Sequence, residues 1–164
     1  LLESRGLGDV YKRQSQILNE ASYVNVAAQA NLDISTRQLS VTVEAYYTGN
    51  SPVTTNKLNV ALMQNNVEGP QTGGSTYNPS AILPNGNYNH QHMLRHLLTG
   101  QWGDDITNTT SGSFFTNTYT YTIPNDLNGI AYDLFNLEVA VFLTETQQNV
   151  VTGNMASMLS LIHI

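Results

Sequence analysis

Residues 39–47, which read LSVTVEAYY, decide the fold because their apolar and polar side chains alternate with a period of two. Such alternation is typical of a β-strand that turns one face to a core and the other to water. Residues 24–32, VNVAAQANL, alternate in the same way. The connection from Asp33 to Arg37 contains Asp and Ser, which form turns by hydrogen-bonding to nearby backbone. Because this connection is short, the two stretches predict an antiparallel hairpin.

The strand pattern continues farther along the chain. Residues 58–62 and 137–143 alternate, residues 115–123 place threonines on one face and aromatics on the other, and Val150-Val151 is expected to begin or form a last short strand. A Gly/Asn/Pro-rich stretch from 65 to 89 predicts one long loop, and such loops are often functional. About six or seven strands joined by turns predict an all-β fold, an antiparallel two-sheet sandwich.

The segment from His90 to Leu98 fits two periods. As a short helical turn, which we predict, it would bury four apolar side chains: Met93, Leu94, Leu97 and Leu98. Three polar side chains would then lie together in water: His92, Arg95 and His96. As a strand, the segment would place its histidines on one face with Tyr88 and Leu94.

The composition excludes several classes of protein. The 164 residues include no cysteine, which rules out disulfides, thiol catalysis and thiolate metal sites. The formal net charge is −6, so no cationic surface is available to neutralise the phosphates of a nucleic acid. No run of about 18 apolar residues is present that could form a transmembrane helix.

The two ends of the chain carry an unusual relation to each other. Residues 9–14 can be encoded by GAT GTG TAT AAG AGA CAG. The reverse complement of that string encodes Leu-Ser-Leu-Ile-His-Ile, which is the sequence of residues 159–164. The string resembles a transposon end used to build sequencing libraries. We therefore expect residues 1–14 to be a disordered, adapter-derived artefact, residues 159–164 to be adapter-derived, and residues 15–158 to be one β-sandwich domain, a fragment of a longer protein.

Three histidines, His90, His92 and His96, lie within seven residues and form the most conspicuous cluster of possible ligands. A helical i, i+4 pair such as His92 and His96 can chelate zinc or copper, with Asp104 or Asp105 as a third ligand. His90 would lie on the other side of such a helix, and no acid is identifiable that would orient the imidazoles. We therefore predict no metal site and no cofactor.

Two further side chains in this region are candidates for contact with a partner. Arg95 could recognise a carboxylate, although a structural ion pair with Asp104 or Asp105 is the simpler interpretation. Trp102 could stack on a sugar or on a partner side chain, although a tryptophan in an all-β domain more often packs in the core or at its rim. Together with His90, His92 and His96, they complete the predicted contact set.

Signatures of catalysis are absent from the sequence. It contains no Gly-x-Ser-x-Gly, no His-Glu-x-x-His and no phosphate-binding glycine loop that precedes a Lys at a helix start. Asp104 and Asp105 are adjacent, so in a strand their carboxylates would face opposite ways. We therefore predict that the chain is not an enzyme and has no catalytic residues.

Four stretches together resemble one protein family: LSVTVEAYYTG (39–49), KLNVALMQNNVEGPQ (57–71), YNHQHMLRHLLTGQWGDDI (88–106) and LEVAVFLTETQQNVVT (137–152). They are similar to the Omp28-like outer-membrane lipoprotein family of Bacteroidetes. The most specific parts are the strand Asn59 to Asn65 with its Gly-Pro-Gln exit, and the His-x-His-x-x-Arg run that begins at His90.

The resemblance implies an immunoglobulin-like β-sandwich that is commonly carried behind a thioredoxin-like portion and a lipoprotein signal. It also implies a location in the cell envelope, at the outer membrane or cell surface, with anchoring through a lipid outside this fragment. Adhesion at the cell surface is the role that the resemblance suggests, and no established catalytic residues come with it.

Three functions follow as expectations. The first is a non-catalytic binding or structural module whose partner, an unknown protein or glycan at the cell surface, meets it between residues 65 and 102. The alternative is an accessory domain of a thioredoxin-like redox protein whose catalytic domain lies upstream. The third is a module that binds metal through its histidines.

Overall fold

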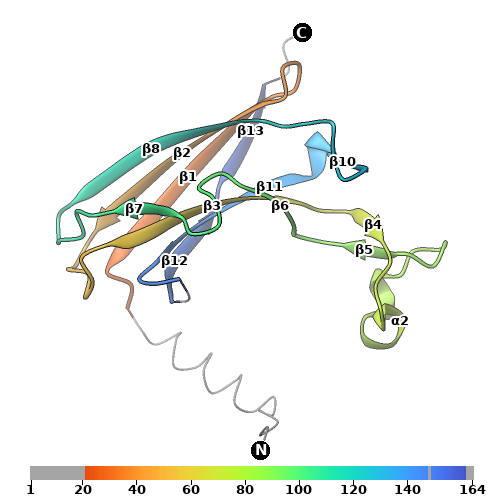
Figure 1. Cartoon of the computed structure of the whole chain (residues 1–164), viewed down its shortest axis with the longest axis horizontal. Coiled ribbons are helices and arrows are strands. Elements are labelled where there is room, and N and C mark those ends of the chain that lie inside the picture. Colours follow the sequence, from red (N-terminus) through yellow and green to blue (C-terminus); the bar gives the residue numbers. More distant parts are fainter. Residues whose placement is uncertain (1–20, 148, 162–164) are drawn as a thin grey trace, which may run out of the picture.

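The computed structural model describes residues 21–147 and 149–161, which form two β-sheets packed face to face (Figure 1). The strands are β1 Val24–Asp33, β2 Gln38–Tyr47, β3 Asn56–Gln64, β4 Val67–Gly69, β5 Tyr88–His90, β6 Met93–Leu97, β7 Asp104–Ile106, β8 Phe114–Thr122, β9 Asp126–Leu127, β10 Ile130–Ala131, β11 Leu137–Thr144, β12 Val150–Met155 and β13 Ser157–Leu161. The helical elements are α2 Gly74–Tyr77 and two 3₁₀ turns, η1 Pro79–Ala81 and η2 Leu134–Asn136. The all-β sandwich predicted from the sequence is thus confirmed.

Strands β1 and β2 form the predicted antiparallel hairpin, paired from Val24–Tyr47 at one end to Asp33–Gln38 at the other. Its turn is fixed by the carboxylate of Asp33, whose Oδ1 accepts hydrogen bonds from the backbone N–H groups of Ser35 (2.8 Å) and Thr36 (3.2 Å). The Ser35 hydroxyl, which also donates to Oδ1, and these backbone donors lower the pKa of Asp33 to about 2. The turn residues therefore act as their types predict.

The sheets differ in strand order. Sheet A runs β13-β1-β2-β8, and sheet B runs β12-β11-β3-β6 with β7 also paired to β3. The pairing of β1 with β13 is parallel, whereas the other strand pairs of both sheets are antiparallel in the part of the chain that the structure describes. β9 pairs with β10 and β4 with β5 in separate two-stranded ribbons.

The core lies between the sheets and consists of the inward-facing residues of the alternating strands. The fully buried β2 side chains, in sequence order, are Leu39, Val41, Val43, Ala45 and Tyr47, and those opposite them on sheet B include Leu58, Val60, Leu62, Val139 and Leu143. Each valine or leucine side chain buried in this way contributes roughly 1.5–3 kcal/mol of transfer free energy. The period of two therefore accounts directly for the core.

The helical turn predicted at residues 90–98 is wrong. Residues 93–97 form strand β6, whose backbone groups pair with β3, and His92 precedes it with a left-handed φ of 52°. Pairing with β3 supplies the hydrogen bonds that an isolated helical turn would otherwise make internally, and this tertiary pairing overrides the local period. The helical turn of the structure, α2, lies instead within the stretch from 65 to 89, which also contains β4, η1 and most of β5.

The structure describes part of one terminal segment and none of the other. Residues 1–14, expected to be adapter-derived, lie outside the described residues. Of residues 159–164, the first three pair with Asn31 to Asp33 as the last part of β13. Backbone pairing of this kind is available to almost any sequence, so the origin of residues 159–164 stays a prediction. None of the helices between residues 21 and 161, residue 148 aside, is long and apolar enough to span a membrane.

Candidate functional site

The residues selected from the sequence lie at the β6 edge of sheet B and in the segments on either side of it. His90 ends β5, His92 lies in the bend before β6, Arg95 and His96 belong to β6, and Trp102 lies in the turn before β7. The structure directs these side chains to different environments, so they do not converge on one site.

A β-bulge in β6 sets the direction of Arg95 and His96. Leu62 of β3 pairs with His96, whereas the next residue, Met63, pairs with Leu94, so Arg95 is the extra residue of the bulge. Because directly paired residues share a face and Leu62 is fully buried, His96 faces the interior. The bulge turns Arg95 inward as well, and only 5% of its surface is exposed.

Arg95 is held by a carbonyl and an aromatic ring. Its Nη2 donates to the backbone oxygen of Ile130 at 2.7 Å, and the guanidinium carbon lies 4.2 Å from the centre of the Tyr132 ring. The Tyr132 hydroxyl donates to the backbone oxygen of Arg95 at 3.3 Å. A cation over a desolvated aromatic face is stabilised by about 2 kcal/mol. Arg95 therefore fastens the β9–β10 ribbon to the sandwich, and almost none of its surface is exposed.

The ion pair expected between Arg95 and Asp104 or Asp105 is wrong. Asp105 instead pairs with Lys57, its cross-strand neighbour in the β3–β7 register. The two aspartates lie on β7, so they sit on the far side of the turn that follows β6. Strand pairing thus gives Asp105 a cation on an adjacent strand rather than the one nearer in sequence.

His96 is packed between the two sheets. Its ring stacks on Tyr121 of β8, with 4.0 Å between ring centres and 10° between ring planes. Burial lowers the pKa of His96, because the charged imidazolium loses hydration. The arrangement favours a neutral imidazole that closes the side of the sandwich between β6 and β8.

His92 and His90 are placed by local contacts of another kind. The N–H of His92 donates to Asn65 Oδ1 at 2.8 Å, and its Nδ1 lies 2.8 Å from Glu138 Oε2. The ring of His90 lies 4.9 Å from that of Tyr88, two residues earlier on β5. Each histidine therefore has its own neighbours, and the helical chelate considered for His92 and His96 does not form.

Metal ligands are not gathered anywhere that the structure describes. Across residues 21–147 and 149–161, no three His, Asp or Glu side chains lie close enough together to hold one ion. Of the described histidines, Glu138 contacts the ring of His92 alone. The histidine-based metal module thus has no assembled donor set to support it.

Trp102 is presented to solvent by a tight turn. Its side chain is 56% exposed, so it does not pack in the core. The next residue, Gly103, has φ of 70°, and a Cβ there would lie 2.7 Å from the backbone oxygen of Leu58. The turn can lie this close to β3 only with glycine at position 103.

The segment from β4 to β5 forms a lobe at one end of the sandwich, and we call residues 67–90 the β4–β5 lobe. Figure 1 shows β4, β5 and α2 projecting beyond the sheets at the right. At its surface, Tyr77 is 88% exposed and borders a hollow of about 100 Å³ with Asn78 and Tyr88. The sequence predicted a long loop here, but no feature of it indicated that Tyr77 would be exposed.

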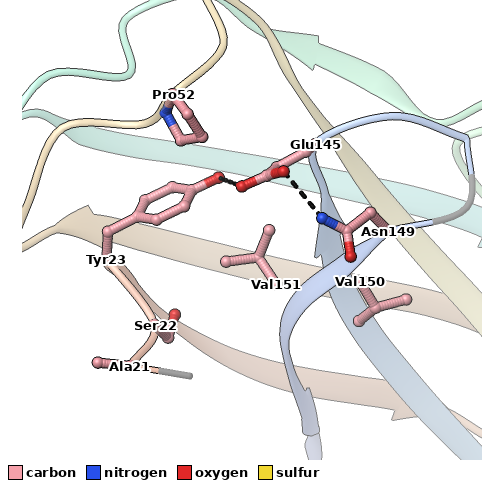
Figure 2. A pocket seen from close by; sticks show the side chains of 8 residues that line it. All are labelled: Ala21, Ser22, Tyr23, Pro52, Glu145, Asn149, Val150 and Val151. Atoms are coloured by element: carbon pink, nitrogen blue, oxygen red, sulfur yellow. Dashed lines mark hydrogen bonds between the residues drawn. The ribbon is translucent and has the colours of Figure 1, made fainter. Parts of the chain in front are cut away.

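A second hollow, of about 350 Å³, lies where β1 begins and β12 starts (Figure 2). The Tyr23 hydroxyl donates to Glu145 Oε1 at 3.1 Å, and Asn149 Nδ2 donates to Glu145 Oε2 at 2.8 Å. Val150 and Val151 form its apolar side. Burial, with the nearby carboxylate, raises the pKa of Tyr23, so its hydroxyl stays protonated and continues to donate.

The contacts in the second hollow are those of a structural network. Both oxygens of Glu145 accept hydrogen bonds, and the Tyr23 oxygen also accepts from Asn56 Nδ2 at 3.2 Å. Within the described ranges, neither hollow places a serine or threonine hydroxyl on a histidine, a pair that often forms the nucleophile and base of acyl transfer. Sequence reasoning missed this network because Tyr23 and Glu145 are 122 residues apart.

Comparisons with known proteins assign the chain to a family. The model of the outer membrane protein Omp28 family matches residues 7–157. Among solved structures, a domain of the outer membrane lipoprotein Omp28 from Porphyromonas gingivalis matches with a TM-score of 0.53 and 16% identity, covering 86% of this chain and 92% of that one. No curated protein matches the chain significantly.

Two more solved structures resemble the chain to different degrees. HBP35 of Porphyromonas gingivalis matches with a TM-score of 0.68 and 15% identity over 93% of this chain, which spans just under half of HBP35, 46%. A β-glucosidase from Thermotoga neapolitana reaches a TM-score of only 0.38 and supports no conclusion. The chain belongs to the Omp28 family of outer-membrane proteins, and its place in the cell is the outer membrane or the cell surface.

Proposed function

We propose that the chain is a non-catalytic binding module of an outer-membrane lipoprotein and that it meets its partner, a protein or glycan at the cell surface, through the β4–β5 lobe. The observation that carries this proposal is the projection of the lobe from the sandwich with Tyr77 almost fully exposed. Sandwich domains commonly bind through loops at one end, where a rigid scaffold presents variable segments.

The lobe is ordered by hydrogen bonds of its own. Glu68 Oε1 accepts from Asn85 Nδ2 at 2.6 Å and from Asn87 Nδ2 at 2.7 Å. Asn78 Nδ2 donates to the Tyr88 hydroxyl at 2.9 Å. A binding surface held in one conformation loses less entropy on association than a flexible loop does. The lobe therefore supports binding better than its Gly/Asn/Pro-rich sequence suggests.

Tyr77 has the chemistry of a contact residue. Tyrosine offers a large apolar ring and a polar hydroxyl with few rotatable bonds, and it is enriched among the residues that dominate binding energies. Trp102, exposed at the turn before β7, is a second candidate for such a contact. His90 lies within the lobe and His92 next to it, whereas Arg95 and His96 face the interior and contribute only by holding the framework.

The experiment compares cells that produce the parent lipoprotein with its natural lobe or with Tyr77→Ala, using a monolayer of epithelial cells as the probe. We expect adherent cells to fall severalfold, because removal of a dominant aromatic contact typically costs 2 kcal/mol or more of binding energy, estimated as about thirtyfold in affinity. Phe135→Ala, a second exposed aromatic outside the lobe, is the matched control and should adhere normally.

Equal adhesion by the Tyr77 variant at equal surface abundance would contradict the proposal. The redox alternative predicts that outcome, because a chain without cysteine would leave thiol chemistry to another part of the protein.

A further inference from the structure

We propose a second binding site, independent of the lobe, on the outer face of sheet A: a site for the side chain of a lysine or arginine from a partner protein. The site is built from three neighbouring strands whose outward residues line up in rows by the strand register. The rows are Asn25–Tyr46–Phe114, Ala27–Glu44–Thr116 and Gln29–Thr42–Thr118.

Ala27 makes this face concave. Its methyl group is the smallest side chain of the three rows, and the surface is hollowed above it. One hollow, of about 140 Å³, lies against Tyr46 and Phe114, and another, of about 240 Å³, lies against Gln29 and Thr42. Both hollows are lined by Ala27 and Glu44, so together they follow β1 as one shallow groove.

Two aromatic rings border one end of the groove. Tyr46 and Phe114 are cross-strand neighbours, and their side chains are 49% and 58% exposed. An aromatic face attracts a cation within about 6 Å of the ring centre, and Arg and Lys are the usual protein cations in such contacts. The end of the groove therefore offers two rings to a cationic side chain.

Glu44 supplies the negative charge. It is adjacent to Tyr46 along the same face of β2, about 7 Å away by the repeat of a strand, and it lines both hollows. No residue that the structure describes forms a hydrogen bond or an ion pair with its carboxylate. A cation between the rings and Glu44 would gain both interactions at once.

None of the lysine and arginine side chains that the structure describes occupies this site. Arg37 donates to the backbone oxygens of Ile123 and Pro124, Lys57 pairs with Asp105, and Arg95 is buried. With a net charge of −6, the chain also attracts cationic partners over longer distances. The charge complementarity favours a basic side chain from another molecule over a neutral sugar, which would use the rings but would not need Glu44.

The test is an NMR titration of the full 164-residue chain with N-acetyl-arginine amide. The matched uncharged probe is N-acetyl-citrulline amide, and methyl β-glucoside represents a sugar. We expect saturable amide shifts confined to residues 25–29, 42–46 and 114–118 with the arginine probe alone. Glu44→Gln and Phe114→Leu should each weaken the affinity about twofold to fivefold.

Both substitutions lie on an exposed face, and an unchanged spectrum of each free variant shows that it is folded. Tyr77→Ala should leave arginine binding unchanged, which separates this site from the lobe. Equal binding of arginine and citrulline, binding of the glucoside instead, or an affinity that Glu44→Gln does not change would each overturn the proposal.

Discussion

Replacing Tyr47 by Phe removes one hydroxyl from the centre of a buried network and leaves the ring in place. The Tyr47 hydroxyl donates to Asn56 Oδ1 at 2.9 Å, and neither side chain has any exposed surface. Asn56 Nδ2 in turn donates to the Tyr23 oxygen at 3.2 Å, which links the network to the second hollow. The substitution therefore leaves Asn56 Oδ1 buried, without a hydrogen-bond donor and out of reach of water.

The size of the effect follows from that geometry. Leaving a buried acceptor unpaired lowers the free energy of unfolding by about 1–3 kcal/mol. Loss of the hydroxyl leaves almost no cavity, so packing adds little to this effect. The matched control is Tyr46→Phe, one residue away on the opposite face of β2, where the hydroxyl faces solvent. A surface substitution of this kind changes stability by less than about 0.5 kcal/mol.

The assay is urea unfolding followed by far-ultraviolet circular dichroism. We expect Tyr47→Phe to lower the free energy of unfolding by about 1–3 kcal/mol with an unchanged dependence on urea. A loss no larger than that of Tyr46→Phe would refute the reasoning, because the Tyr47–Asn56 hydrogen bond would then contribute nothing that water does not replace.

Three further predictions concern His96, a glycine turn and the chain ends. Because burial lowers the pKa of His96, the unfolded state binds a proton at this histidine at a higher pH than the folded state does. The free energy of unfolding is therefore unaffected by protonation of His96 above about pH 6.5, and it decreases as the pH falls below that value. His96→Phe, which keeps a ring against Tyr121, should flatten the fall in melting temperature between pH 8 and 5, and an identical slope would count against it. Gly103→Ala should destabilise the fold by at least about 2 kcal/mol, since φ is positive and the added Cβ meets the Leu58 oxygen. Gly100→Ala, with positive φ but open space, should cost only about 1 kcal/mol by the same urea assay, and equal losses would contradict the close contact. Finally, amplification across both ends from the source DNA should recover neither residues 9–14 nor 159–164 in the natural reading frame, and recovery of either would disprove the adapter origin.

The sandwich could be predicted because its strands obey a local rule. In β2, every second side chain is fully buried, so the period is visible in the sequence without knowledge of the partner strands. The same is true of β11, where the buried side chains alternate from Leu137 to Leu143. Where one face of a strand meets a core, the sequence carries enough information to place it.

The conformation of β6 and the orientation of its side chains could not be predicted, because both depend on pairing with β3. Residues 93–97 have a local pattern compatible with a helix, and only pairing with β3 makes them a strand. The bulge that turns both Arg95 and His96 inward is a property of the pair, as is the contact of Arg95 with Tyr132, 37 residues away. No spacing in the sequence reports either feature.

The candidate binding surfaces could also be predicted only in part. The sequence indicated that residues 65–102 contain a functional region, since a long Gly/Asn/Pro-rich stretch interrupts the strands. It did not indicate which side chains the lobe exposes. The groove on sheet A was equally hidden, because Ala27, Glu44 and Phe114 come together only through the registers of β1, β2 and β8.

The central claim, that this Omp28-family module binds through its β4–β5 lobe, is tested most directly by competition. The purified 164-residue chain is added to cells that carry the parent lipoprotein before they meet the epithelial monolayer. We expect adhesion to fall with increasing concentration of the natural chain, and to fall only at about thirtyfold higher concentration when the added chain carries Tyr77→Ala. Equal inhibition by both chains, or inhibition by neither, would contradict the claim.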